Sequence, residues 1–191
     1  MHPSSPLAIL LVDGYNVIGA WSSLKKTRDK PISSRSAYRD GLEAARQELV
    51  EVLINYSAFQ GYETQVVFDA HSQNTPTYCE VLTTHVSVCY TDFGQTADTY
   101  IEKFCASFRF SLAPKSQRLI VATSDRAQQL TVVGYGAEWM SSLQLASDVD
   151  FTARRILRKN QPPKQSSGRF LFNSLDPQAQ QRLAQWRKGL K

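Results

Sequence analysis

Short apolar runs alternate with longer amphipathic segments along most of this chain. The apolar runs predict β-strands at residues 7–12, 64–68, 85–90, 118–123 and 138–140. Helical spacing of apolar residues predicts a long helix over 36–59, a helix opening near Thr96, a short one over 126–132 and one from about 142 to 159. Strands that alternate with helices form parallel β-α-β units. The expected fold class is therefore α/β, with three layers, α/β/α, and a central parallel sheet of about five strands.

The rest of the chain reads as connections and an appendage. Residues 13–34 and 72–80 are rich in turn-forming and polar residues, so both are predicted to be loops. Residues 160–169 read as a linker, and Asp176–Pro177 is a good start for a C-terminal helix. We therefore expect one domain over residues 1–159, followed by a basic linker and C-terminal helix over 160–191.

The cysteines and the longest apolar runs indicate the cellular compartment in which the protein is expected. Cys79, Cys89 and Cys105 cannot all pair with one another, and none lies in a CxxC motif. Buried thiols are therefore expected rather than a disulfide framework. No run approaches the roughly 18 apolar residues of a membrane span, and the N-terminus lacks the basic region of a signal peptide. The expected location is the cytoplasm, or an organelle stroma of equivalent reducing character, with no membrane partner.

Positive charge is concentrated at the C-terminal end. The net charge is +5, but residues 153–191 hold ten Lys or Arg and one acid, whereas residues 1–152 carry more acids than bases. A basic tail on an acidic body fits a polyanionic partner such as RNA. A merely soluble tail is an equally good interpretation of the charge alone. The residues expected to contact phosphate are Arg154, Arg155, Arg158 and Lys159.

Acidic residues follow the predicted strands. Asp13, Asp69 and Asp125 each come just after an apolar run, while Asp92 follows the third strand and Asp98 lies in the first turn of the next helix. The carboxyl ends of parallel strands meet at one edge of a sheet, so these side chains are expected to converge. Crowded carboxylates repel one another, and a hard divalent cation relieves that repulsion. Oxygen ligands favour Mg²⁺ or Mn²⁺ over Zn²⁺.

Each residue also has a plainer explanation. Asp98 could simply favour the helix dipole, Asp125 could be an N-cap, and Asp69 could start a turn. Asp13 is harder to explain away, because Gly14 allows close backbone approach and Asn16 adds an oxygen ligand or a hydrogen-bond donor. Ser124, Arg126 and His71 are candidate phosphate contacts, with surface or loop roles as the alternative. Glu102 fits either a supporting role near Asp98 or an exposed helix position, and Tyr15, Trp21 and Tyr90 fit either base stacking or packing.

Four segments together resemble a known family. They are DGYNVIGAW at 13–21, VVFDAH at 66–71, TADTYIE at 96–102 and ATSDRAQQ at 122–129, with GYGAEWMSS at 134–142 in support. In this order and at these intervals they resemble the YacP-like branch of the NYN family, relatives of the PIN nucleases, over about residues 7–158. DGYN alone is only moderately specific.

The resemblance implies a PIN-like fold and a metal-dependent ribonuclease, in a group where ribosome-associated cleavage of mRNA is known. By position, Asp13, Asp98 and Asp125 resemble the acidic metal-binding centre, and Asn16 and Asp69 its supporting members. This chain has Gln95 where the family usually has Glu. Glutamine brings no negative charge, which puts the metal affinity or the number of metals in question. Asp92 is a candidate to compensate.

Three functions therefore compete. The first is an Mg²⁺- or Mn²⁺-dependent endoribonuclease acting in mRNA decay or processing, with RNA and, by the resemblance, the ribosome as partners. The second is a non-catalytic RNA- or ribosome-binding module, which Gln95 favours. The third is a phosphohydrolase of small phosphates. A haloacid-dehalogenase-type phosphatase would need DxD after the first strand, where Tyr15 stands instead, and the GxGxxG of a nucleotide-binding Rossmann domain is absent.

Overall fold

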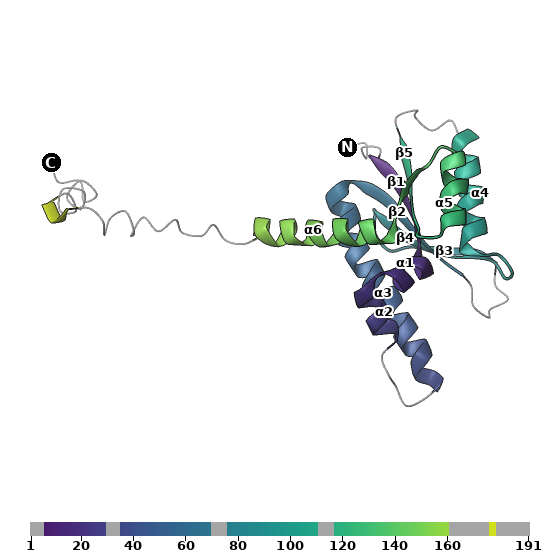
Figure 1. Ribbon diagram of the computed structural model, residues 1–191, viewed down its shortest axis with the longest axis horizontal. Helices are drawn as coiled ribbons and strands as arrows, with labels where there is room; N and C mark the ends of the chain where they lie inside the picture. Colours follow the sequence, from purple (N-terminus) through teal and green to yellow (C-terminus); the bar gives the residue numbers. More distant parts are fainter. Residues whose placement is uncertain (1–5, 30–34, 70–75, 111–116, 161–175, 179–191) are drawn as a thin grey trace. The chain divides into compact units, whose positions relative to one another are not determined.

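One six-stranded sheet organises the protein. The computed structural model describes residues 6–29, 35–69, 76–110, 117–160 and 176–178. The strand order is β3-β4-β2-β1-β5-β6 (Figure 1), and all neighbours are parallel except β3 and β4. The strands are β1 (Ala8–Asp13), β2 (Tyr62–Phe68), β3 (Tyr78–Val81), β4 (Val86–Tyr90), β5 (Arg118–Ala122) and β6 (Glu138–Met140).

Helices cover both faces of this sheet. They are α1 (Gly14–Ala20), α2 (Ser22–Arg28), α3 (Arg35–Gln60), α4 (Ala97–Phe110), α5 (Arg126–Gly134) and α6 (Ser142–Asn160). The chain divides into two compact units, residues 1–154 and 155–191. None of the helices in the described ranges is long and apolar enough to cross a membrane.

The two cores follow from the alternation of side chains along each strand. On β1, Leu10 and Val12 face one way and pack with residues of α1, α2, α3 and the start of α6. Leu11 faces the other way and packs with residues of α4 and α5. Because successive residues of a strand point to opposite faces, a strand buried on both sides must be apolar on both, as β1 is from Ala8 to Val12. This burial confirms the expected three-layer α/β/α architecture.

Two predicted loops are wrong. The segment after β1 contains α1 and α2, because Asp13 caps α1 at the last residue of the strand and the chain turns directly into a helix. The segment predicted as a loop over 72–80 contains the start of β3, which is antiparallel and raises the strand count to six. All four residues of β3 are exposed, so this strand lacks the alternation by which strands are recognised. Beyond Gln178, the predicted C-terminal helix lies outside the described residues.

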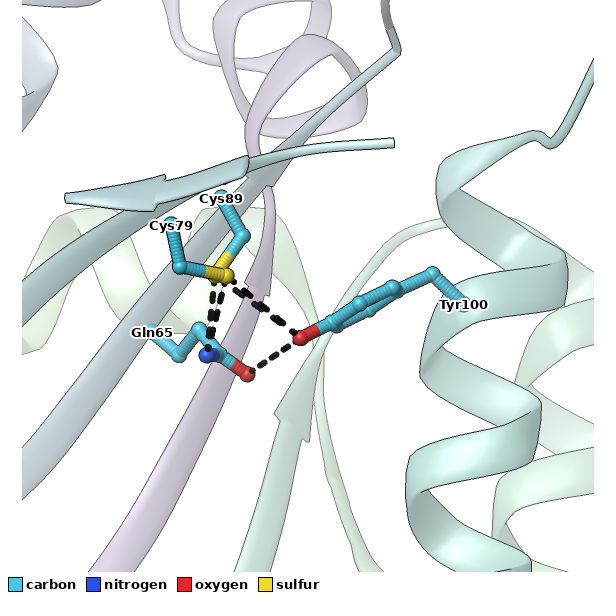
Figure 2. Close-up of a disulfide and its surroundings, with 4 residues drawn as sticks. All are labelled: Gln65, Cys79, Cys89 and Tyr100. Atoms are coloured by element: carbon cyan, nitrogen blue, oxygen red, sulfur yellow. Dashed lines mark hydrogen bonds between the residues drawn. A yellow bond between two sulfur atoms is a disulfide. The ribbon is translucent and has the colours of Figure 1, made fainter. Parts of the chain in front are cut away.

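Strand β3 also overturns the expectation for two of the cysteines. Its register places Cys79 opposite Cys89 of β4, and the two form a disulfide across the strands. Figure 2 shows the amide of Gln65 and the hydroxyl of Tyr100 directed at the sulfur atoms. The Gln65 amide lies 2.9 Å from Cys89 Sγ. Among the described residues, Cys105 alone is a free and buried thiol, as the sequence predicts.

Candidate active site

The carboxyl ends of three neighbouring strands form one side of a cavity. Strand β1 lies between β2 and β5, and the chain order reverses at this point, where open α/β sheets bind their ligands. The cavity has a volume of about 350 Å³. Its described lining consists of Asp13, Tyr15, Asn16, Asp69, Thr96, Ala97, Asp98 and Asp125. Four aspartates from four separate segments therefore meet at one edge of the sheet.

Asp13 is the most buried of the four, with 7% of its surface exposed. It ends β1 and caps α1, since its Oδ1 accepts a hydrogen bond of 3.1 Å from the backbone N–H of Asn16. Burial raises the pKa of Asp13 to about 7, and the charges of Asp98, Asp69 and Asp125 add to the rise against the opposing effect of the Asn16 N–H. Without a neutralising cation, this carboxyl is thus protonated in much of its population at neutral pH.

Asp69 and Asp98 sit on either side of the start of α4. The Asp69 carboxylate accepts a short hydrogen bond from the backbone N–H of Ala97, which fixes the first turn of α4 against the end of β2. Asp98 follows in that turn, so its position relative to Asp69 is set by this contact. Burial raises the pKa of Asp98, and the charges of Asp125, Asp69 and Glu102 raise it further. The mutual repulsion expected from the sequence is therefore present.

Asp125 both caps a helix and lines the cavity. Its Oδ1 accepts hydrogen bonds from the backbone N–H groups of Ala127, at 2.7 Å, and Gln128, at 3.0 Å. Its own N–H donates to Thr123 Oγ1 at 3.0 Å. The two interpretations of Asp125 that the sequence left open are therefore compatible, because the cap holds the carboxylate at the cavity.

Asn16 ties three segments together. Its Oδ1 accepts from the backbone N–H of Ser124 at 2.7 Å and from the hydroxyl of Ser142 at 3.0 Å. Ser124 in turn accepts from the N–H of Ser142. The side-chain oxygen of Asn16, expected as a ligand, is thus occupied as an acceptor that joins α1 to the β5–α5 connection and the start of α6. Ser124 takes part in this junction and does not line the cavity.

The other predicted phosphate contacts lie elsewhere or outside the described residues. Arg126 is exposed in the first turn of α5 and does not line the cavity. His71 falls outside the described residues. The side chains Arg154, Arg155, Arg158 and Lys159, here called the α6 basic cluster, are all exposed along the second half of α6.

Gln95, Asp92 and Glu102 are not part of the cavity lining. Gln95 instead lines a second, more open cavity of about 440 Å³, beside Tyr100 and Lys103 of α4. The Asp92 carboxylate accepts a 2.7 Å hydrogen bond from the N–H of Phe93 within its own exposed loop. The charge of Glu102 makes the smallest of the four contributions to the raised pKa of Asp98, after those of burial, Asp125 and Asp69. The structure gives no support to compensation by Asp92.

The donor set of the cavity matches a hard divalent cation. Carboxylate oxygens dominate, and the repulsion that raises the pKa of Asp13 and Asp98 is the kind that a cation relieves. Among the described residues, no three His, Cys, Asp or Glu side chains form a ready-made metal-binding group. The cavity therefore offers carboxylate oxygens of the type that Mg²⁺ or Mn²⁺ binds, but the described side chains are not already arranged as a complete set of ligands.

Two contacts at the cavity were not predicted. Arg46 of α3 donates a short hydrogen bond to the hydroxyl of Tyr15, and its guanidinium lies 5.2 Å from the centre of the Tyr15 ring. The available signal was the position of Arg46 on the apolar face of α3, one turn after Leu42 and one turn before Leu49. A cation on such a face indicates a specific partner. Nothing in the sequence says which partner it is.

Comparison with known proteins agrees with this geometry. The family model of the YacP-like NYN domain matches residues 10–188. The chain is 32% identical over 184 residues to the protein YacP of Bacillus subtilis, covering 95% of this chain and 97% of that protein. The crystal structure of Rae1 (YacP) from Bacillus subtilis superposes with a TM-score of 0.61 at 31% identity, over 95% of each chain. A variant of Rae1 gives 0.62 at 29% identity, over 92% of this chain and 98% of that one.

The match spans nearly the whole length of both proteins. The chain belongs to the YacP-like NYN domain family, a nuclease-type family of the PIN-like superfamily.

Proposed function

We propose that the protein is a divalent-metal-dependent endoribonuclease that hydrolyses RNA phosphodiester bonds at the aspartate cavity. The observation that carries the proposal is the convergence of four carboxylates from separate segments around one cavity at the switch point of the sheet. Membership of a nuclease-type family supports the class of reaction. We propose that the protein acts in mRNA decay or processing in the cytoplasm, with the ribosome as a further partner.

Asp13, Asp98 and Asp125 are the residues that would hold Mg²⁺ or Mn²⁺, with Asp69 in support. A bound ion of this kind lowers the pKa of water and stabilises the charge that develops on a phosphodiester. Asp69 fixes the first turn of α4, and Asn16 fixes the connection that carries Asp125. Both residues therefore act by holding the carboxylates in place.

The acidic cavity repels RNA, so attraction must come from elsewhere. The α6 basic cluster is exposed and carries four positive charges on one helix. Neutralising phosphates with such residues releases counterions and makes binding depend on salt. We assign the cluster to RNA binding without sequence preference.

A cleavage assay on a circular single-stranded RNA tests the function, because a circle has no ends and only an endonuclease opens it. Wild type should cleave with Mn²⁺ or Mg²⁺ and stop when EDTA is added. Asp13→Asn and Asp98→Asn should lose more than about a hundredfold in rate, since the metal contributes several kcal/mol. Asp150→Asn, an exposed aspartate on α6, is the matched control and should cleave normally. Equal cleavage by all four proteins would mean a contaminant or a misassigned site.

A non-catalytic RNA-binding module is the second candidate. It is favoured by Gln95 in place of the usual Glu, and by the lack of a ready-made metal group among the described side chains. It predicts that wild type and Asp13→Asn bind RNA equally and that neither cleaves it with any divalent ion.

A further inference from the structure

The aspartate cavity has an aromatic wall. Of the described residues that line it, only Tyr15 is aromatic, and its side chain is partly exposed. Phe68 lies behind it, with ring centres 5.1 Å apart, and Tyr90 stacks on Phe68 at 5.9 Å. Trp21, by contrast, is buried in the core. Of the three aromatic residues singled out for base stacking, Tyr15 is the one that reaches the cavity.

Arg46 holds Tyr15 in this position. Its guanidinium donates to the Tyr15 hydroxyl and lies 5.6 Å from the centre of the Phe68 ring, over a second aromatic face. Glu43 forms a 2.7 Å ion pair with the same guanidinium. Only 19% of the Arg46 side chain is exposed, and its buried Nε has no hydrogen-bond partner among the described residues. Such a cation is costly to bury, and the contacts with both rings and Glu43 offset that cost while fixing the tyrosine.

The rest of the cavity needs a neutral contact for its substrate. Four carboxylates line it together with Tyr15, and carboxylates repel the phosphates on both sides of a cleavage point. Stacking of a base on an aromatic ring involves no charge on the protein and accepts any base. A base can stack in this way only if it is unpaired, because a duplex keeps its bases inside the helix.

We propose that the base next to the scissile phosphate stacks on Tyr15 and that Arg46 is the positioning residue of Tyr15. This inference rests on the proposed function and deepens it. Tyr15 holds the base, and the aspartates carry the chemistry.

The test couples protein variants to abasic RNA. The full-length chain with Asp98→Asn, which blocks cleavage, is titrated with Mg²⁺ present into a fluorescein-labelled single-stranded RNA and into a set in which one abasic nucleotide is moved along the strand. Tyr15→Leu should weaken binding of the intact RNA by roughly 5- to 100-fold. Tyr15→Phe keeps the ring and should lose far less. Tyr78→Leu, at an exposed tyrosine of β3, is the matched control and should bind as the parent does.

At one position along the RNA, the abasic nucleotide should weaken binding to the parent protein. The same abasic nucleotide should cause no further loss of affinity in Tyr15→Leu, because both changes remove the same contact. Arg46→Gln should show the same lack of additivity at that position, and Arg46→Lys should restore part of the binding. A merely structural role of Arg46 would lower affinity equally for intact and abasic RNA. In cleavage, the Tyr15→Leu loss should appear in KM more than in kcat, and annealing a complementary strand over the cleavage point should block the reaction.

The outcomes separate the two proposals. Cleavage by wild type with additive effects at every abasic position, or an equal loss in Tyr15→Phe and Tyr15→Leu, overturns the stacking proposal alone. If wild type cleaves no RNA, but Tyr15→Leu and one abasic position still have non-additive effects on binding, the proposed function alone is overturned. A wild type that neither binds nor cleaves RNA overturns both.

Discussion

Asp13→Asn should make the metal-free protein more stable at pH 8. The Asp13 carboxyl titrates at about 7 in the folded state and near 3.8 when unfolded. Between these values the folded state binds the proton that the unfolded state has released, so stability falls as the pH rises from about 4 to about 7. The difference corresponds to about 4 kcal/mol at pH 8, as an upper estimate. Asparagine carries no charge and still offers an oxygen to the N–H of Asn16, so the helix cap is kept.

The assay is urea unfolding followed by far-ultraviolet circular dichroism, in EDTA, at several pH values from 4 to 8. The stability of wild type relative to Asp13→Asn should be highest near pH 4 and should decrease steadily as the pH rises. Asp98, whose pKa is also raised, contributes to the slope in both proteins, and the comparison therefore reports Asp13 together with its coupling to Asp98.

Mg²⁺ should narrow the difference. A cation that binds only the folded state stabilises wild type by about 2.7 kcal/mol at a hundred times its Kd, and the variant should gain much less. Identical pH dependence in the two proteins, or a variant that is less stable at pH 8 in EDTA, would refute the assignment of Asp13 as a buried carboxyl crowded by its neighbours.

Three further predictions concern other parts of the chain. Replacing the α6 basic cluster with glutamine should weaken binding to single-stranded RNA and reduce the salt slope of log K by about 0.7 for each phosphate that the cluster no longer neutralises; an unchanged slope in filter binding would remove the cluster from the interface. Reducing the Cys79–Cys89 disulfide, which joins residues 10 positions apart, should lower the free energy of unfolding by about 2.5 kcal/mol in urea titrations with and without dithiol, and Cys79→Ser should make the protein insensitive to the reductant. Gly14→Ala should cost about 1–3 kcal/mol, because its new methyl group would overlap the buried Phe68 ring, whereas Gly19→Ala, where nothing lies within 4 Å, should be tolerated; equal thermal stabilities of these two variants would contradict the close approach.

The parts of the fold that the sequence predicts are those whose signal is local. Strands β1 and β5 are buried on both faces over residues 8–12 and 119–122, and these stretches therefore appear in the sequence as continuous apolar runs. The acids that follow them converge because the ends of parallel strands must share an edge. Asp13 and Asp125 can be placed at one site for this reason, without knowledge of any contact between them.

The parts that the sequence does not predict depend on contacts between distant positions. Strand β3 is fixed by its pairing with β4 and shows no apolar face of its own. The pairing of Cys79 with Cys89 depends on that register, and Arg46 meets Tyr15 across 31 positions. Helix α1 is hidden for a different reason, since Asp13 both ends a strand and caps a helix, and only the first of these roles is evident from the apolar run before it.

The junction made by Asn16 has a consequence for protein synthesis. Its amide oxygen joins a residue near the start of the chain to Ser142, 126 positions later. During translation, the first strand and its aspartate leave the ribosome long before their partners. We therefore expect the connection that carries Asp125 to reach its final position in a nascent chain only after the beginning of α6 has emerged.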